Sequence, residues 1–194
     1  MATYKDAGVD IDAGDRAVEL MKASIAKASR PEVIGGIGGF AGLFDASKLK
    51  SMKQPLLATS TDGVGTKTEI ARALGKYDTI GEDLVAMVVD DLVVCGAEPL
   101  FMTDYIAVGK VIPENIADIV AGIARGCAKA NTALIGGETA EHPGLLDDDE
   151  FDIAGAATGV VDSDHQLGSH RVKAGDVIIA MPSSGFHANG FSLV

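Results

Sequence analysis

The sequence predicts an α/β domain, in which strands and helices alternate along most of the chain. Three observations carry this prediction. Apolar residues recur at helical spacing in three segments, and short apolar runs lie between those segments. The third observation is the glycine content: 24 of 194 residues are glycine, about 12 % against a usual ~7 %, and they cluster where predicted strands end.

The first half of the chain predicts, in order, a helix, a glycine-dense loop, a buried strand and a short helix: residues 12–29, 35–42, 55–61 and about 68–75. The first helix is expected because its apolar residues recur at spacings of three and four until Pro31 ends the pattern. The strand PLLATST runs into the loop DGVGTK, and Gly75 ends the short helix that follows.

The second half predicts two longer helices and four strands: residues 79–95 and 113–127 as helices, and residues 99–108, 132–135, 151–161 and 176–181 as strands. Thr79 and Glu82 have the spacing of a capping box, and Pro113 suits the first turn of a helix. The strand at 132–135 is expected to end at a turn formed by Gly136 and Gly137. Residues 183–194 are predicted to form a loop that enters a helix, so a second domain is expected to begin near residue 170.

Composition and charge disfavour several classes of protein. Lys plus Arg is 16 and Asp plus Glu is 28, so the formal charge is −12. This acidic balance, without any stripe of basic residues, disfavours a protein that binds nucleic acid. Asp90 and Asp91 interrupt the longest apolar stretch, so no membrane span is predicted. The first residues lack the apolar core of a signal peptide, and Cys95 and Cys127 have the pattern of reduced core thiols. A cytoplasmic protein is therefore expected.

Three acidic residues lie at or near positions where an α/β domain binds ligands. Asp91 falls on the apolar stripe of its predicted helix, where a carboxylate is costly unless a cation or hydrogen-bond donors meet it. Asp62 and Glu138 each follow a predicted strand, the end at which open α/β folds bind ligands. A salt bridge would also explain Asp91, and ordinary turns would explain the other two. The pattern favours a metal–phosphate site, because Mg²⁺ takes carboxylate and phosphate oxygens together.

Two further segments are candidate anion sites. In DGVGTK, Gly63 and Gly65 let backbone N–H groups approach an anion, while Thr66 and Lys67 add a hydroxyl and a positive charge. The spacing is not that of a Walker A loop, and an ordinary strand–helix turn has the same pattern. The segment SSGFHANG, residues 183–190, offers hydroxyls, a histidine and an asparagine before an expected helix, although alone it is a weak motif.

Six motifs that occur in order along nearly the whole chain resemble the phosphoribosylformylglycinamidine cyclo-ligase family, also called aminoimidazole ribonucleotide synthetases, of purine biosynthesis. The motifs are YKDAGVDIDAG (4–14), RPEVIGGIGGFAGLF (30–44), STDGVGTK (60–67), DLVVCGAEPLF (91–101), GGETAEHPG (136–144) and SSGFHANGFSLV (183–194). Members of that family are longer and have two α/β domains. The resemblance therefore implies that residues 1–169 form an N-terminal ATP-binding and dimerisation domain and that residues 170–194 begin a C-terminal domain.

The resemblance also implies an α+β type of domain with a mixed sheet, and a homodimer in which the N-terminal sheets join into a β-barrel. ATP and Mg²⁺ are implied as cofactors, with ATP near the dimer interface. The implied reaction is ATP-driven ring closure of formylglycinamidine ribonucleotide to aminoimidazole ribonucleotide through an iminophosphate. Such phosphoryl transfer is catalysed mainly by positioning and charge neutralisation. The 194-residue chain alone is expected to have little or no turnover.

Matching each motif to its position gives the candidate residues their implied roles. The metal ligands are Asp62, Asp91 and Glu138. The groups implied around ATP are Lys22, Gly63, Gly65, Thr66, Lys67, Glu138 and Thr139. The substrate side comprises Ser184, His187 and Asn189, and the residues implied in catalysis are Asp62, Lys67, Asp91 and His187. For Lys22, a solvated lysine on the first helix is an equally simple interpretation.

The chain departs from the family pattern at four positions in or beside these motifs: Asp90 in place of Asn, His142 in place of Met, Ala188 in place of Ser and Phe191 in place of Tyr. Asp90 adds a negative charge beside Asp91, and the last two changes remove hydroxyls near the substrate loop. Two other classes stay open: a small-molecule kinase of the same superfamily and a non-catalytic nucleotide-binding dimerisation module. A purely structural barrel is disfavoured, because such a core has no use for buried, unpaired carboxylates.

Overall fold

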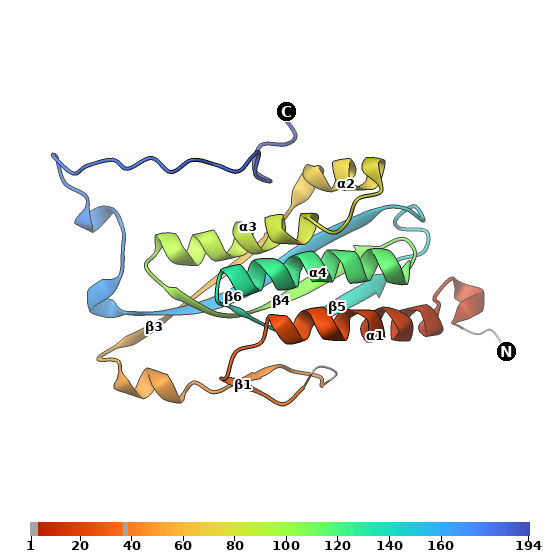
Figure 1. Ribbon diagram of the computed structural model, residues 1–194, viewed down its shortest axis with the longest axis horizontal. Helices are drawn as coiled ribbons and strands as arrows, with labels where there is room; N and C mark the ends of the chain where they lie inside the picture. The colour runs from red at the N-terminus through yellow and green to blue at the C-terminus, as the bar shows by residue number, and fades with distance from the viewer. Residues whose placement is uncertain (1–3, 37–38) are drawn as a thin grey trace.

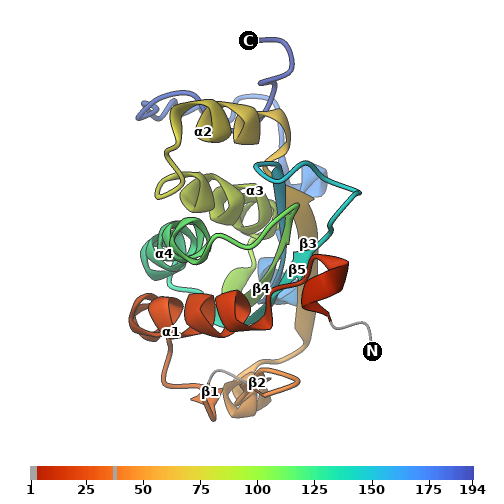
Figure 2. The same ribbon diagram turned by 90° about the vertical axis from the view of Figure 1, so that its right-hand side faces the viewer.

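The computed structural model describes residues 4–36 and 39–194 and contains a four-stranded sheet with helices packed on one face (Figures 1 and 2). The helices are α1 (Ile11–Lys27), α2 (Thr68–Leu74), α3 (Ile80–Val94) and α4 (Pro113–Lys129). The strands of the sheet are β3 (Pro55–Gly63), β4 (Glu98–Val108), β5 (Ala133–Glu141) and β6 (Phe151–Asp162). Two short strands, β1 (Val33–Ile34) and β2 (Leu43–Phe44), pair with each other outside that sheet.

The four strands lie in the order β3-β6-β4-β5, so β3 and β5 form opposite edges. β4 and β5 are parallel and are joined through α4, whereas β6 pairs antiparallel with both β3 and β4. The sheet is therefore mixed, as the family resemblance implied.

The core lies between this sheet and a layer in which α3, α4 and α1 lie side by side (Figure 2). The largest fully buried side chains include Leu84, Leu92, Met102, Ile106, Ile116, Ile119, Ile123 and Ile153. Side chains alternate between the two faces along each strand. On the face opposite the helices, Leu57 is 68 % exposed and Tyr105 is 41 % exposed. Within the described residues, the sheet is thus covered on one face and open on the other.

Most predicted elements are confirmed, because their apolar spacing and their glycine and proline boundaries agree with the final packing. α1, α3, α4, β3, β4 and β6 begin and end within two residues of their predicted bounds. Pro113 occupies the first turn of α4, and Gly75 ends α2 in the left-handed conformation, with φ +57°. The predicted glycine-dense loop lies between β1 and β2, and its residues 37–38 are outside the described part of the chain.

The strand predicted at 132–135 is longer than expected. β5 does not end at Gly136 and Gly137 but continues through them to Glu141, because both glycines pair with β4, opposite Thr103 and Asp104. The predicted turn at these glycines is therefore wrong.

Two predictions near the end of the chain and one at a helix start are also wrong. Residues 176–181 are not a strand, and residues 183–194 contain turns rather than a helix. In the described chain these apolar residues pair with no strand, and Ile178 is 96 % exposed. Thr79 does not cap α3 with its side chain, and Glu82 instead pairs with Arg125 and Lys129 of α4.

The two cysteines are both free but differ in burial. Cys127 is buried under the sheet, and this burial raises the pKa of its thiol to about 12. Cys95, predicted as a core thiol, is exposed at the end of α3. Among the described residues, none of the helices combines the length and the apolar character needed to cross a membrane.

Candidate functional site

The DGVGTK segment begins with the last two residues of β3, at an edge of the sheet, and leads through a short 3-10 turn (Gly65–Lys67) into α2. Asp62 therefore lies inside the strand, and the prediction that it follows the strand is wrong. Gly65 has φ +70°, a left-handed conformation that glycine adopts without strain. The Asp62 carboxylate accepts a hydrogen bond from the N–H of Gly63 at 2.8 Å, and the Thr68 hydroxyl donates to the carbonyl of Gly65 at 2.9 Å. The loop is thus held by its own side chains in a compact turn at the end of the strand.

Lys67 connects this loop to two distant parts of the chain. Its Nζ donates to the Asp83 carboxylate of α3 at 2.9 Å and to the carbonyl oxygen of Phe186 at 2.9 Å. The ring of Phe191 lies 5.1 Å from the same Nζ, within the range of a cation–π contact.

A second contact joins the same loop to the C-terminal segment, residues 183–192. The hydroxyls of Thr66 and Ser192 lie 3.0 Å apart. Within the segment, Nδ1 of His187 is 3.0 Å from Oδ1 of Asn189, and Ser184 is exposed. The structure therefore brings Thr66 and Lys67, predicted around ATP, together with the segment that carries the predicted substrate residues.

The prediction that Asp91 is buried is wrong. Asp90 and Asp91 are both exposed, and the Asp91 carboxylate accepts a hydrogen bond from the Ser60 hydroxyl of β3 at 2.8 Å. The reason is a small difference in the rotation of α3 from the predicted one, which leaves residue 91 at the margin of the buried face. The buried positions of the helix are Ile80, Gly81, Leu84, Val85, Val88, Val89 and Leu92. The argument against a structural barrel that rested on buried carboxylates at this helix therefore fails.

Asp62 and Glu138 lie on opposite faces of the sheet. Across the strands, Asp62 is in register with Gly155, then Asp104, then Gly137. Glu138 is the residue after Gly137, so its side chain points to the other face, beside Tyr105. Three strand spacings of roughly 4.8 Å also separate the two edge strands. Within the described residues, His, Cys, Asp and Glu side chains form no group of three that could hold a metal.

The remaining predicted residues lie away from the DGVGTK loop. Lys22 is exposed on α1 and pairs with Glu19 on the same helix. α1 lies at the opposite end of the helical layer from α2 (Figure 2). Thr139 is half-buried on β5, which forms the other edge of the sheet. These residues are thus not brought together with Lys67 within this chain.

Sequence reasoning missed Asp104, which lies on the helix-facing side of β4. A Cβ at residue 137 would lie 1.7 Å from Oδ1 of Asp104, so any larger residue there would force the Asp104 carboxylate to move. Burial raises the pKa of Asp104 to about 7, and its charge contributes to the raised pKa of Cys127. The available signal was an aspartate that interrupts the alternation of apolar residues along the predicted strand.

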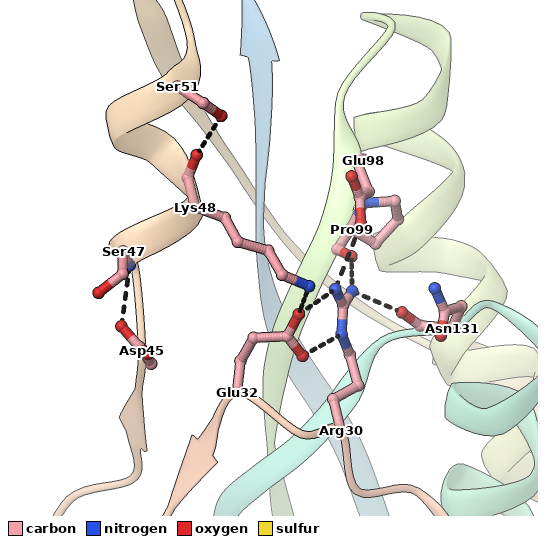
Figure 3. Close-up of polar contacts among 9 residues, drawn as sticks. All are labelled: Arg30, Glu32, Asp45, Ser47, Lys48, Ser51, Glu98, Pro99 and Asn131. Atoms are coloured by element: carbon pink, nitrogen blue, oxygen red, sulfur yellow. Dashed lines mark hydrogen bonds and ion pairs between the residues drawn. The ribbon is translucent and has the colours of Figure 1, made fainter.

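A second missed cluster joins the chain around β1 to the start of β4 (Figure 3). The Arg30 guanidinium donates to the carboxylates of Glu32 and Glu98 and to the carbonyls of Pro99 and Asn131. Arg30 and Glu32 side chains are 10 % and 8 % exposed, and Lys48 also pairs with Glu32. These contacts use all five guanidinium N–H donors, so the cluster fixes the segments that flank the glycine-dense loop.

Glu32 is expected to make the stability of the folded chain sensitive to acid. Hydrogen bonds from Lys48 and then from Arg30 lower its pKa to about 2, so the folded state favours the ionised form. Its stabilising contribution is present above the ordinary value of about 4.5 and is lost as the pH falls toward 2. We expect Glu32→Gln to melt at a lower temperature than the parent chain at pH 7, with the difference shrinking as the pH falls below 4. Thermal melting followed by circular dichroism measures this, and a pH-independent difference would contradict it.

A one-sided mixed sheet with a Gly–Thr–Lys loop at the end of an edge strand defines a candidate anion-binding α/β domain. Residues 44–161 match the family described as "AIR synthase related protein, N-terminal domain", and the chain belongs to this family. It is 57 % identical over 192 residues to a "Phosphoribosylformylglycinamidine cyclo-ligase" from Desulfitobacterium hafniense, covering 99 % of this chain and 56 % of that protein. A protein of the same description from Geobacillus kaustophilus is 58 % identical, covering 98 % and 55 %.

The chain therefore spans about 56 % of the length of the curated relatives that it matches. Among solved structures, Escherichia coli HypE, a hydrogenase maturation protein, is similar with a TM-score of 0.59 and 20 % identity, covering 81 % of this chain and 46 % of that one. A thiamine-monophosphate kinase from Stenotrophomonas maltophilia has a TM-score of 0.54 and 20 % identity, covering 78 % and 43 %. At these identities the likeness shows the shared fold alone.

Proposed function

We propose that this chain is the N-terminal part of an ATP-dependent cyclo-ligase that converts formylglycinamidine ribonucleotide to aminoimidazole ribonucleotide in the cytoplasm. In the proposed reaction the formyl amide oxygen attacks the γ-phosphorus of ATP and ADP leaves, giving an iminophosphate. The amidine nitrogen then attacks the activated carbon, and inorganic phosphate carries away the former formyl oxygen. An oxide, which is a poor leaving group, is thereby exchanged for phosphate.

The contact between Lys67 and the C-terminal segment is the observation that carries this proposal. A reaction that joins a nucleotide phosphate to a second substrate needs the phosphate-binding and substrate-binding groups at a fixed spacing. Thr66 and Lys67 are the proposed phosphate-binding side chains, with backbone N–H groups near Gly63 and Gly65. The same two side chains contact residues 183–192, where Ser184, His187 and Asn189 are the proposed substrate-binding residues.

Asp62 and Asp91 are the proposed Mg²⁺ ligands on this chain. Ser60 and Asp62 project from the same side of β3, and Ser60 hydrogen-bonds to Asp91, so both carboxylates lie on the helix-facing side near the end of the strand. Two carboxylates suit Mg²⁺, which usually completes its coordination with water and substrate phosphates. Bound there, Mg²⁺ would neutralise triphosphate charge. Glu138 and Thr139 could join such a site only from a second copy, because in this chain they lie at the far edge of the sheet.

The proposed homodimer uses the open face of the sheet. Leu57 and Tyr105 are exposed on this face. A sheet face that carries exposed apolar side chains is rarely left uncovered, so this face is a candidate for contact with a second copy. Pairing of two such faces into a β-barrel would bury them and would bring Glu138 of one copy toward the other copy. The division into residues 1–169 as the N-terminal domain and residues 170–194 as the start of a second domain is part of the same proposal, supported by the exposed apolar segment at 176–181.

The proposal is tested by ring closure in the purified full-length protein. We expect ATP- and substrate-dependent release of phosphate together with aminoimidazole ribonucleotide, and we expect Asp91→Asn to reduce it at least ~100-fold because a metal–phosphate contact is lost. Asp90→Asn is the matched control, since it removes the neighbouring exposed charge and restores the residue usual in the cyclo-ligase family.

Retained turnover in Asp91→Asn would remove that residue from the site. A stable phosphorylated product instead of ring closure would favour a small-molecule kinase. ATP binding without any turnover by the full-length protein would favour the non-catalytic nucleotide-binding dimerisation module.

A further inference from the structure

Asp83 lies in the first turn of α3 and holds the ammonium group of Lys67 at the candidate site. Its carboxylate lies 2.9 Å from Nζ of Lys67, and the Lys67 and Asp83 side chains are only 21 % and 16 % exposed. Removing one member of such a pair leaves the other charge poorly solvated. The pair therefore restrains a lysine side chain that would otherwise sample many rotamers.

The hydrogen bonds of Lys67 define where its ammonium group is held. Both oxygens of the Asp83 carboxylate lie 2.9 Å from Nζ, and the carbonyl of Phe186 accepts a further hydrogen bond at 2.9 Å. The Phe191 ring covers the same ammonium group, with its centroid 5.1 Å from Nζ. The ammonium group thus lies where the DGVGTK loop, α3 and the C-terminal segment meet.

The neighbouring carboxylate of Glu82 has a different set of partners. Glu82 is in the same helical turn, but its side chain pairs with Arg125 and Lys129 of α4. Successive residues on a helix point in directions about 100° apart, so two adjacent acidic side chains contact different neighbouring residues. Glu82 stabilises the contact between α3 and α4, while Asp83 is directed toward the candidate site.

We infer that Asp83 is a positioning residue that fixes the Lys67 ammonium between the phosphate-side loop and residues 183–192, beside the proposed position of the reacting phosphate. This inference rests on the proposed function for its role in turnover. Asp83 itself carries a negative charge and repels a bound triphosphate. Its contribution is therefore to the orientation of Lys67 rather than to the affinity for ATP.

The test compares Asp83→Asn with Glu82→Gln in the full-length protein, using two readouts. The first is acylation of Lys67 by N-hydroxysuccinimidyl acetate, followed by peptide mass spectrometry without any nucleotide. We expect acylation to be at least roughly threefold faster in Asp83→Asn, because the lysine loses its charged partner, and unchanged in Glu82→Gln.

The second readout is steady-state ring closure. In Asp83→Asn we expect kcat to fall about tenfold while KM for ATP stays equal or decreases, because a misoriented lysine affects the transition state and a repelling charge is gone. Asp83→Glu keeps the carboxylate and should restore part of kcat. Glu82→Gln should lower the melting temperature without this separation of kcat from KM.

Equal Lys67 acylation in Asp83→Asn and the parent protein would overturn the inference, whatever the activity. So would a fall in kcat matched by an equal loss of folded protein, as a purely structural role predicts. If the parent protein closes no ring, the proposed function fails, whereas the acylation readout still decides whether Asp83 holds Lys67.

Discussion

Replacing Gly81 with alanine is expected to lower the free energy of unfolding by about 3 kcal/mol, near the upper end for overpacking a core. A Cβ at residue 81 would collide with the backbone of α4, at Ile123 N, Ile119 O and Gly122 C. Backbone atoms cannot swing aside as a side-chain tip can, so α3 and α4 must move apart. Because both helices cover the sheet, the whole layer would lose contacts with it. The opposing gain in helix propensity is at most ~1 kcal/mol.

Gly14→Ala is the matched control for this substitution. Gly14 lies within α1, and a Cβ at that position would meet nothing within 4 Å. It should therefore raise stability by about 0.5–1 kcal/mol through helix propensity alone. Urea unfolding of the two variants measures both values. Equal effects of the two substitutions would contradict the close crossing of α3 and α4.

Replacing Asp104 with asparagine is expected to stabilise the chain at pH 8 and to change little at pH 4. Burial raises the pKa of Asp104 in the folded state from the usual value near 3.8 to about 7. Below pH 3.8 the carboxyl is protonated in both folded and unfolded states. Between the two values only the unfolded state ionises, so stability is lost progressively as the pH rises from 3.8 to about 7, by on the order of 4 kcal/mol in total. Asparagine keeps the shape and does not ionise.

The measurement for Asp104→Asn is the difference in unfolding free energy between variant and parent chain from pH 4 to pH 9. Subtraction removes the contributions of other titrating groups, such as Glu32 at low pH. We expect the difference to grow with pH and to level off above about pH 8. A difference that is constant across this range would show that Asp104 is not titrating between the sheet and the helices.

The helices and three of the four sheet strands could be predicted because their signals are local. Pro113 and Gly75 mark boundaries through their own backbone preferences, and apolar spacing marks the buried faces. β5 could not be bounded in the same way. Gly136 and Gly137 carry turn signals locally, but they pair with β4, and the space above Gly137 is filled by Asp104, from a strand that lies earlier in the chain.

The DGVGTK segment could be selected as a candidate site from the sequence, but its contacts with the rest of the chain could not be predicted. The glycine spacing and the Thr66–Lys67 pair indicated an anion-binding loop, and the structure places this loop against residues 183–192. Asp91 was wrongly predicted to be buried because apolar spacings of three and four define the buried face of a helix only to within about one residue position. The pairing of Lys67 with Asp83 was missed because the two residues are 16 positions apart, one in a loop and the other in the next helix. No regular sequence spacing relates two such positions.

Calorimetric titration of this 194-residue chain with ATP, with and without Mg²⁺, tests the central claim that the DGVGTK loop holds a nucleotide. The comparison variants are Lys67→Met and, as a matched control, Lys76→Met, which removes an exposed lysine paired with Asp78. We predict Mg²⁺-dependent binding that is at least ~10-fold weaker in Lys67→Met and unchanged in Lys76→Met, because one charge-assisted contact to phosphate is lost. Binding of equal strength in both variants, or no binding by the parent chain, would contradict the claim.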